Sequence, residues 1–154
     1  MISPCDLTRT AVDYAQQAGF DLVGVTPVGP SPDWERFQGW LAAGYGGEMA
    51  WLAQRSMERA DPRALLPDAR SLIMLGCSYH CADLPAALRN DPSRGLIAAY
   101  ALGDDYHDLL KPLLFELDAA LRQASGRTSR GRAVVDSSPL LERSWAQRAG
   151  LGFI

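Results

Sequence analysis

The strongest constraint on the fold is a leucine-rich stretch, from Asp105 to Ala124, whose apolar residues recur at the period of an α-helix. These residues share one face of the expected helix: Tyr106, Leu109, Leu110, Leu113, Leu114, Leu117 and Leu121. A helix with one apolar face buries that face against another layer of secondary structure. The sequence therefore predicts a long amphipathic helix that packs on a core.

Three shorter apolar runs predict strands. Ser71–Ser78 is nearly continuously apolar, as strands in the middle of a sheet are, and Asp21–Val25 is a short apolar run that ends just before a proline. Leu96–Ala101 is the third run. Further amphipathic helices are expected over residues 7–18, 33–43 and 48–57. Because helices and short strands alternate irregularly, we expect an α+β layer fold and not a regular doubly wound sheet.

The size and composition fit one globular domain. The chain has 154 residues, of which 47% are hydrophobic and 21% are charged. Its net charge is -3, so it lacks the strongly basic character that favours non-specific nucleic-acid binding, and any such contact must be local. No apolar run approaches the roughly 20 residues that span a bilayer. The N-terminal residues lack the features of a signal peptide, so a cytoplasmic location is expected.

The cysteines do not indicate a metal site or a disulfide framework. Cys5, Cys77 and Cys81 are an odd number in a compartment expected to be reducing. Cys77 and Cys81, with His80 beside them, have C-x3-C spacing, but the chain holds no second ligand pair and no C-x2-C-x2-C-x3-C run. We therefore expect tolerated thiols, a structural His80 and no metal ligands.

An arginine-rich link is the local basic patch. Residues 122–132 carry four arginines, among them Arg127, Arg130 and Arg132. Two interpretations stay open. The link is either a solvated loop or a loop that contacts phosphate oxygens, which the arginine guanidinium suits.

Asp136 is the candidate for a functional acid. Ala133–Val135 is a short β-prone run, Ser138-Pro139 suits the start of a helix, and Gly150 suits its end. The acid is thus expected at a strand-to-helix corner, where a rigid scaffold holds functional side chains. The alternative is that Asp136 only caps the following helix.

Three segments, in order along the chain, carry a resemblance to one family. They are Arg59 with Pro62 and Leu65–Pro67, Tyr100–His107, and Val135–Arg143 with Ala149–Phe153. The first resembles an arginine with a following L-L-P segment. The second resembles the pattern Y-A-x-G-x-D-Y-H, and the third resembles V-D-S-x-P-x-L-E-R with A-G-L-G-[WF]. This set is similar to the N-terminal half of epoxyqueuosine reductase, the cobalamin-dependent iron–sulfur enzyme of tRNA queuosine synthesis.

The resemblance implies an oxidoreductase that converts epoxyqueuosine to queuosine at the wobble position of tRNA, the last step of queuosine biosynthesis. Its partners would be tRNA and an electron donor, with Arg127, Arg130 and Arg132 as candidate substrate contacts. An epoxide oxygen is a poor leaving group until it is protonated, so the reaction needs a positioned acid. By the same match Asp136 is that proton donor, and its pKa is expected to be raised by burial.

The resemblance also implies the cofactors, which are cobalamin and [4Fe–4S] clusters. Arg59 matches an arginine that contacts cobalamin, Ala98 a residue that touches it through the backbone, and Tyr106 and His107 part of the pocket that includes Asp136. For His107, the alternative is a helix-face histidine hydrogen-bonded to the core. The chain contains no ligands for the clusters. Ala99 and Asp104 stand where basic residues are common in the family, which lowers the local positive charge.

The implied fold is a nitroreductase-like α+β domain with a mixed or largely antiparallel sheet flanked by helices. Residues 1–154 would be a single, incomplete N-terminal cobalamin- and substrate-binding domain, truncated at its C-terminus and without the family's ferredoxin-like domain. The main expectation is therefore a reductase fragment that is inactive alone. The alternative is a stand-alone module that binds or carries cobalamin and reduces nothing.

Overall fold

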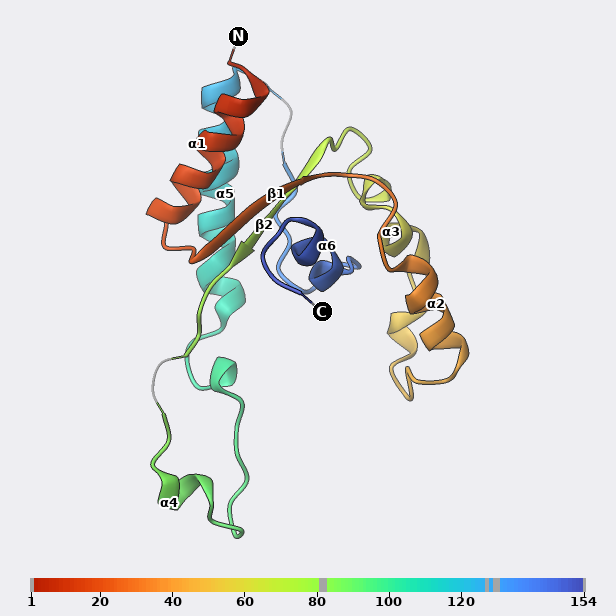
Figure 1. The fold of residues 1–154 in the computed structure, drawn as a ribbon, viewed down its shortest axis with the longest axis vertical. Coiled ribbons are helices and arrows are strands. Elements are labelled where there is room, and N and C mark those ends of the chain that lie inside the picture. The colour runs from red at the N-terminus through yellow and green to blue at the C-terminus, as the bar shows by residue number, and fades with distance from the viewer. Residues whose placement is uncertain (1, 81–82, 127, 129–130, 154) are drawn as a thin grey trace.

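The computed structural model describes residues 2–80, 83–126, 128 and 131–153 (Figure 1). The helices and strands, in chain order, are α1 (Pro4–Gln17), β1 (Leu22–Pro27), α2 (Trp34–Ala42), α3 (Ser56–Ala60), β2 (Ser71–Gly76), α4 (Ala86–Arg89), α5 (Tyr106–Ser125) and α6 (Glu142–Arg148). Short 3₁₀ turns cover Ala50–Leu52, Pro62–Ala64 and Ala99–Ala101. The α+β class expected from the sequence is confirmed. None of the described helices is both long and apolar enough to cross a bilayer.

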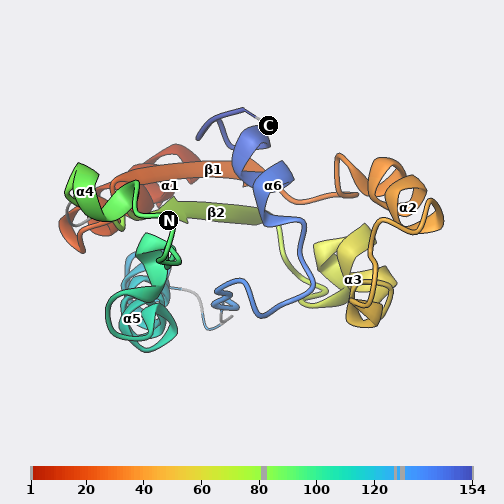
Figure 2. The same cartoon turned by 90° about the horizontal axis from the view of Figure 1, so that it is seen from below.

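Strands β1 and β2 form an antiparallel ribbon that lies between two sets of helices (Figure 2). Its register places Leu22 opposite Gly76. Successive side chains of a strand point to opposite faces, so neighbouring residues serve different layers. Val23 packs toward α1 and α5, whereas Gly24 faces α6.

Helices α1 and α5 cover one face of the ribbon. They lie side by side and, with the turn before β1, bury Ala15, Phe20 and Leu117 (Figures 1 and 2). Helix α5 is the leucine-faced helix that the sequence predicts. It begins at Tyr106 because Asp105 is its N-cap, where the carboxylate accepts the backbone N–H of His107 at 2.9 Å.

Helix α6 covers the other face of the ribbon. Its Trp145 is fully buried, and the end of the helix approaches β1 closely at Gly24. A Cβ atom at Gly24 would clash with the backbone carbonyl of Ala149, so this position requires glycine. We call α1, β1, β2, α5 and α6 together the ribbon core.

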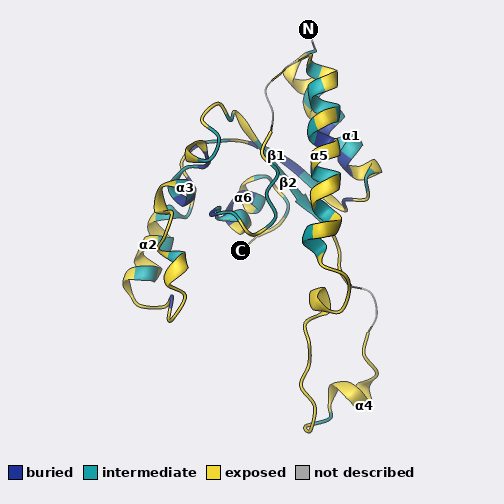
Figure 3. Cartoon of the chain, turned by 180° about the vertical axis from the view of Figure 1, so that it is seen from behind, coloured by how far each residue is buried: buried dark blue, intermediate teal, exposed yellow. Residues whose placement is uncertain are grey.

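Two parts extend from the ribbon core. The lobe (residues 33–70) contains α2 and α3, and the arm (residues 77–104) contains α4. Figure 3 shows the arm as exposed along most of its length. In the described part of the chain, the buried aliphatic and aromatic side chains other than prolines lie in the ribbon core or in the turn before β1: Ala11, Ala15, Phe20, Leu117 and Trp145.

Two predicted strands and one predicted helix are wrong. Leu96–Ala101 ends in a 3₁₀ turn, and Ala133–Val135 is irregular. Among the described residues neither run is hydrogen-bonded into the β1–β2 sheet, and β-prone residues form a strand only with a partner. The helix expected over 48–57 is divided into the turn Ala50–Leu52 and α3. The cause is Arg55, whose φ of 54° is left-handed and interrupts a right-handed helix.

Candidate active site

Asp136 lies at the centre of a hydrogen-bonded cluster at the start of α5. Its Oδ1 lies 2.7 Å from Nε2 of His107, and its Oδ2 accepts the hydroxyl of Tyr106. The rings of Tyr106 and His107 stack with their centroids 4.3 Å apart. The loop before α6 thus brings a carboxylate to two proton-bearing side chains of another helix.

The imidazole of His107 lies between two carboxylates. Its second nitrogen, Nδ1, lies 2.8 Å from Oδ1 of Asp105, the same oxygen that caps α5. A protonated imidazole donates from both nitrogens, and each nitrogen here faces an acceptor. The site therefore stabilises the charged form of His107.

A tight turn presents the side chain of Asp136. The φ of Asp136 is 37°, in the left-handed region that Asp adopts more readily than most residues. Directly after it, the N–H of Ser137 donates to the carbonyl of Val135. Unusual backbone conformations at residues with several side-chain partners are typical of functional sites.

The structure does not give Asp136 the capping role that was the alternative to a functional one. Helix α6 begins at Glu142, later than Ser138-Pro139 suggested, its N-cap is Leu141, and no side chain caps it through a hydrogen bond. Asp136 therefore does not cap the following helix. Its carboxylate is bound to the first turn of α5 instead.

The pKa of Asp136 is lowered, which is opposite to the direction expected from the sequence. Burial raises the pKa of this carboxyl, but the hydrogen bonds from Tyr106 and His107 outweigh that effect. Desolvation is incomplete because the Asp136 side chain is 53% exposed. The cluster thus favours the ionised carboxylate.

The partners of Asp136 hold their protons more tightly than usual. Hydrogen bonds to Asp136 and Asp105 raise the pKa of His107, and the hydrogen bond to Asp136 raises the pKa of Tyr106 to about 12. A larger fraction of His107 is thus protonated at neutral pH than of an ordinary histidine. The His107–Asp136 pair then shares one proton, and the protonation behaviour belongs to the pair as a whole. Such a pair is suited to general acid–base catalysis.

A cleft of about 660 Å³ opens beside Asp136, between α2 and the start of α6. Its lining combines an apolar wall with both signs of charge: Asp33, Arg36, Phe37, Trp40, Asp136, Leu140, Leu141, Glu142, Arg143 and Ser144. A mainly apolar cleft with a few converging polar groups is typical of a ligand site. A smaller pocket, of about 330 Å³, is lined by residues between Tyr100 and His107.

Glu142 is a further carboxyl in the wall of this cleft and was not among the residues predicted for the site. Burial raises its pKa, and the charge of Asp136 adds to the effect. The L-E-R segment that follows Asp136 contains Glu142 and is the signal that could have found it. The N-cap Asp105 is likewise a missed member of the site, although an acid just before a predicted helix is a recognisable cap.

Arg59 and Ala98, the other two residues matched to cofactor contacts, lie outside the hydrogen-bonded cluster. Arg59 is buried on α3, donates to the backbone carbonyl of Gln54, and places its Cζ 5.9 Å from the ring centroid of Trp51. Burial lowers the pKa of Arg59, and the charge of Arg55 adds to this. Ala98 is exposed on the arm, just before the turn Ala99–Ala101.

The arginine loop is only partly described. Arg127 and Arg130 lie outside the described residues, and Arg132 is exposed. The link is fastened to α5 by Asp118, whose Oδ1 accepts the N–H of Gly131 at 2.6 Å. Both interpretations of this loop therefore stay open.

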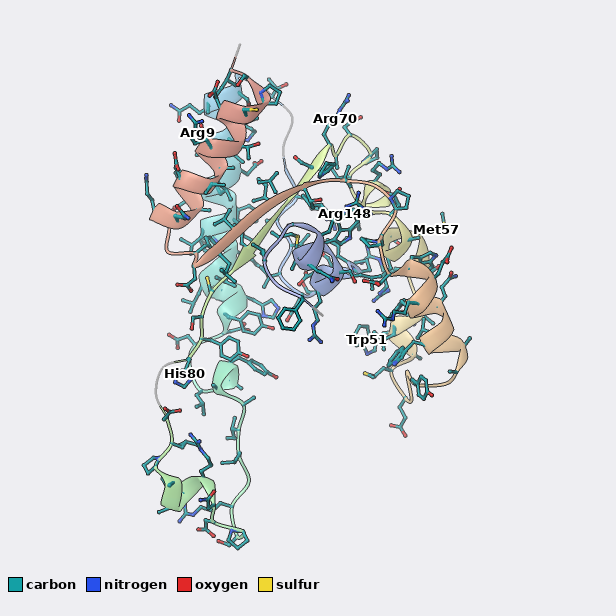
Figure 4. All side chains as sticks on the ribbon, viewed as in Figure 1. Arg9, Trp51, Met57, Arg70, His80 and Arg148 are labelled. Atoms are coloured by element: carbon teal, nitrogen blue, oxygen red, sulfur yellow. The ribbon has the colours of Figure 1, made fainter. Side chains whose placement is uncertain are left out.

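His80 and the described cysteines, Cys5 and Cys77, are exposed at the surface of the chain. His80 lies where the arm leaves the ribbon core (Figure 4), with its Nε2 3.7 Å from Oδ1 of Asp83. Cys5 and Cys77 are exposed free thiols, and Cys81 lies outside the described residues. Within the described ranges, no three His, Cys, Asp or Glu side chains gather closely enough to hold a metal ion.

The fold and the cluster together define an α+β protein with an acid–base pair at the edge of a cleft. Residues 59–137, about half of the chain, match the family model described as "Epoxyqueuosine reductase QueG, DUF1730". The chain belongs to the epoxyqueuosine reductase family.

Relatives and solved structures agree with this assignment. The epoxyqueuosine reductase of Salmonella typhimurium is 39% identical over 157 residues, covering 99% of this chain and 41% of the relative. A crystal structure of epoxyqueuosine reductase with an epoxyqueuosine-modified tRNA-Tyr stem loop matches with a TM-score of 0.79 at 28% identity, covering 97% of this chain and 39% of that one. The Bacillus subtilis enzyme, solved with its catalytic aspartate loop swung out of the active site, gives a TM-score of 0.75 at 28% identity and the same coverage, 97% and 39%. The chain spans about 40% of the length of these proteins.

Proposed function

We propose that residues 1–154 form the substrate-protonating part of an epoxyqueuosine reductase, an enzyme that reduces epoxyqueuosine to queuosine in tRNA. The observation that carries this proposal is the binding of Asp136 to His107 and Tyr106 beside a cleft, in a chain of this family. The relative solved with a modified tRNA stem loop supports tRNA as the substrate.

The chemistry explains why an acid is needed. Reduction of an epoxide to an alkene takes up two electrons and two protons. Both C–O bonds break, the two carbons form a double bond, and the oxygen leaves as water. An unprotonated epoxide oxygen would leave as a strongly basic alkoxide, so the protein has to place a proton on that oxygen.

The His107–Asp136 pair supplies this proton. A substrate that fills the cleft displaces water from the Asp136 carboxylate, and desolvation raises the pKa of that carboxyl. The proton shared across the 2.7 Å between Nε2 and Oδ1 then moves to Asp136 and from there to the epoxide oxygen. His107 takes up a proton from solvent, and delivery of this second proton by the same route lets the oxygen leave as water. Tyr106, with a pKa raised to about 12, stays protonated and keeps the carboxylate oriented.

The residues of this chain fit a corrin ring and do not fit an iron–sulfur cluster. Exposed apolar residues flank Ala98, namely Ile97, Tyr100 and Leu102, and suit the face of a large macrocycle. Arg59 and the cluster around Asp136 are the proposed polar contacts. When bound, cobalamin supplies electrons to the substrate. A [4Fe–4S] cluster takes four thiolates, and three cysteines cannot provide them.

We extend the proposal to the domain and to its tRNA contacts. The ribbon between two helix layers is proposed to be part of a nitroreductase-like domain. The arginines of the loop, Arg127, Arg130 and Arg132, are proposed to contact tRNA phosphates, because the net charge of -3 leaves only local patches for that role.

A hybrid enzyme tests the proposed function. Residues 1–154 replace the matching N-terminal segment of the Salmonella typhimurium relative, and conversion of epoxyqueuosine in tRNA is measured by mass spectrometry of the nucleosides. We expect the hybrid to be active and Asp136→Asn to reduce conversion by a factor of about 100 or more, with tRNA binding kept.

The matched control is Asp108→Asn, an exposed acid in the same first turn of α5, which should keep the activity. Near-normal conversion by the Asp136→Asn hybrid would remove Asp136 from the acid role.

A further inference from the structure

Asp105 uses one carboxylate oxygen for two contacts with the same residue. Its Oδ1 accepts the backbone N–H of His107 at 2.9 Å and lies 2.8 Å from Nδ1 of the His107 ring. The first contact is the N-cap of α5, so it fixes this oxygen relative to the helix that carries the ring. The second contact therefore holds Nδ1 from a fixed oxygen, while Nε2 faces Asp136.

Asp105 is a carboxylate at neutral pH. The hydrogen bonds from the backbone and the ring of His107 lower the pKa of Asp105, and the charge of Lys111 adds to this effect. A carboxylate accepts hydrogen bonds and donates none. The contact of 2.8 Å between Oδ1 and Nδ1 thus favours a proton on Nδ1.

The position of this proton decides whether His107 can supply another one. With Nδ1 protonated, the proton on Nε2 is the one that moves to Oδ1 of Asp136, and the transfer leaves a neutral ring and a carboxylic acid. With Nδ1 unprotonated, Nε2 holds the single proton of a neutral ring. Transfer of that proton would leave an imidazolate anion, a far stronger base than a carboxylate. The His107–Asp136 pair then has no proton to give.

Asp105 acts through His107 and not on a molecule in the cleft. The residues that line the cleft include Asp136 but neither Asp105 nor His107, whereas Asp105 and His107 both line the smaller pocket. The charged groups that act on His107 are Asp136 and Asp105, and the ring of Tyr106 stacks on its imidazole. Asp105 is thus placed to position a proton on the ring without touching the substrate.

We propose that Asp105 is a positioning residue that holds the Nδ1 proton of His107, so that the Nε2 proton is free to pass to Asp136. This role deepens, and rests on, the proposed function of Asp136. The position of the proton on the ring can nevertheless be measured without any reaction.

The nitrogen-15 chemical shifts of His107 report which nitrogen carries the proton. The chain has 2 histidines, so a His80→Ala background leaves His107 as the single imidazole in NMR spectra of the labelled protein. Above the pKa of His107 the ring carries one proton, and the two shifts give the fractions of the Nδ1–H and Nε2–H tautomers. Asp105 and Asp136 compete for this proton across 2.8 Å and 2.7 Å, so the wild type should contain both tautomers.

Asp105→Ser separates the ring contact from the helix cap. Serine is a good N-cap, but its hydroxyl ends one bond short of the position of Oδ1 and does not reach Nδ1. We expect circular dichroism to show a folded protein, and His107 above its pKa to be almost wholly in the Nε2–H form. Wild-type tautomer fractions in Asp105→Ser overturn the proposal.

Asp105→Asn is the conservative variant. Its amide oxygen can make both contacts of Oδ1, and the cap keeps that oxygen in place, so the Nδ1–H tautomer should be retained. The matched control is Asp108→Asn, an exposed acid in the same turn, which should leave the tautomers unchanged. If Asp105→Asn instead behaves as Asp105→Ser does, the acceptor at Nδ1 does not select the tautomer, and the proposal is wrong.

Asp136→Asn provides a test that leaves Asp105 intact. Among the described residues, Asp105 is then the remaining carboxylate within hydrogen-bond reach of the His107 ring. The neutral ring should therefore be in the Nδ1–H form. A neutral ring in the Nε2–H form would contradict the proposal, and this test holds even if Asp105→Ser does not fold.

The hybrid enzyme separates this role from the proposed function. Asp105→Ser should lower kcat by a factor of about 10 to 100 with little change in KM for tRNA, whereas Asp105→Asn should stay within a factor of about 5 of wild type. If the tautomer shifts as expected but every hybrid is inactive, the positioning role stands and the function fails. If the tautomer does not shift while Asp136→Asn abolishes activity, the function stands and the positioning role fails.

Discussion

The ribbon core and the lobe both contain tryptophan, but they bury it to different extents. Trp145 on α6 is fully buried, whereas Trp51 in the lobe is 57% exposed. No residue of α2 is buried. The aromatic rings of this helix contact one another instead, with centroids 6.0 Å apart for Trp34 and Phe37 and 6.1 Å apart for Phe37 and Trp40.

The difference follows from what each helix packs against. Helices α1, α5 and α6 lie on the two faces of the β-ribbon, which covers much of their apolar surface. The aromatic face of α2 instead lines the cleft that also contains Asp136 and Glu142. Stability should therefore come mainly from the ribbon core, and ligand binding should occur at its border with the lobe.

Removing Trp145 should have the largest effect on stability. Trp145→Ala leaves a cavity beneath α6 and is expected to lower the free energy of unfolding by about 3–5 kcal/mol. Trp51→Ala, the exposed counterpart, loses mainly its contact with Arg59 and should cost about 1 kcal/mol or less. Urea unfolding followed by circular dichroism measures both. Equal losses would mean that the lobe contributes to the core as much as the ribbon does.

Gly24→Ala should have the next largest effect. The added Cβ would meet the backbone carbonyl of Ala149, and relieving the clash should cost about 1–3 kcal/mol. Gly29→Ala is the matched control, because its Cβ would meet no atom within 4 Å. Thermal unfolding compares the two. If Gly24→Ala is tolerated as well as Gly29→Ala, α6 does not depend on this close approach to the ribbon.

The sequence predicts the ribbon core well, because the apolar pattern that identifies each of its helices and strands lies within that element. The leucine face over Asp105–Ala124 and the apolar run Ser71–Ser78 correspond closely to α5 and β2. The strands expected at Leu96–Ala101 and Ala133–Val135 are absent, because strand formation depends on a partner that the local sequence does not specify. Periodicity thus predicts amphipathic helices more reliably than isolated strands.

The sequence indicates the residues of the site better than their chemistry. The resemblance names Asp136, Tyr106 and His107, but the lowered pKa of Asp136 follows from hydrogen bonds made from a turn in which its φ is 37°. No periodic pattern encodes that turn. The buried Oε1 of Glu142 depends on how α6 is placed against the cleft, so local sequence could not reveal it.

The Asp136–His107 pair should make part of the free energy of unfolding depend on pH. The apolar contacts of the ribbon core should contribute a part that does not. The folded pKa of Asp136 lies below 3.8, so its contribution to stability is present above pH 3.8 and is lost as the pH falls through the folded value. The folded pKa of His107 lies above 6.5, so its contribution is present below pH 6.5 and is lost as the pH rises through the folded value.

The stability difference between wild type and Asp136→Asn should therefore be largest between pH 3.8 and 6.5 and smaller on both sides. Urea unfolding at a series of pH values measures this difference. Trp145→Ala, measured in parallel, should show a loss that varies much less with pH. A pH-independent difference for Asp136→Asn would mean that the ion pair does not form in solution.

The smallest effect on stability is expected at Asp105, in the first turn of α5. This helix belongs to both regions: its buried Leu117 lies in the ribbon core, and its first turn lies at the border between the ribbon core and the lobe. Asp105→Ala removes the acceptor for the backbone N–H and for Nδ1 of His107. The pKa of His107 should therefore fall, though less than in Asp136→Asn, because the hydrogen bond to Asp136 is the larger influence. NMR titration measures this shift, with Asp108→Ala as the control in the same turn.

Asp105→Ala should lower the free energy of unfolding by only about 0.5–1 kcal/mol, the lower part of the range for a lost N-cap, because the leucine face and not the exposed cap holds α5 on the ribbon. A loss of Tm as large as that of Gly24→Ala would place the first turn of α5 within the ribbon core. The boundary between the stabilising and the ligand-binding regions would then pass through Asp136 itself, and substitutions at the acid could no longer be interpreted apart from folding.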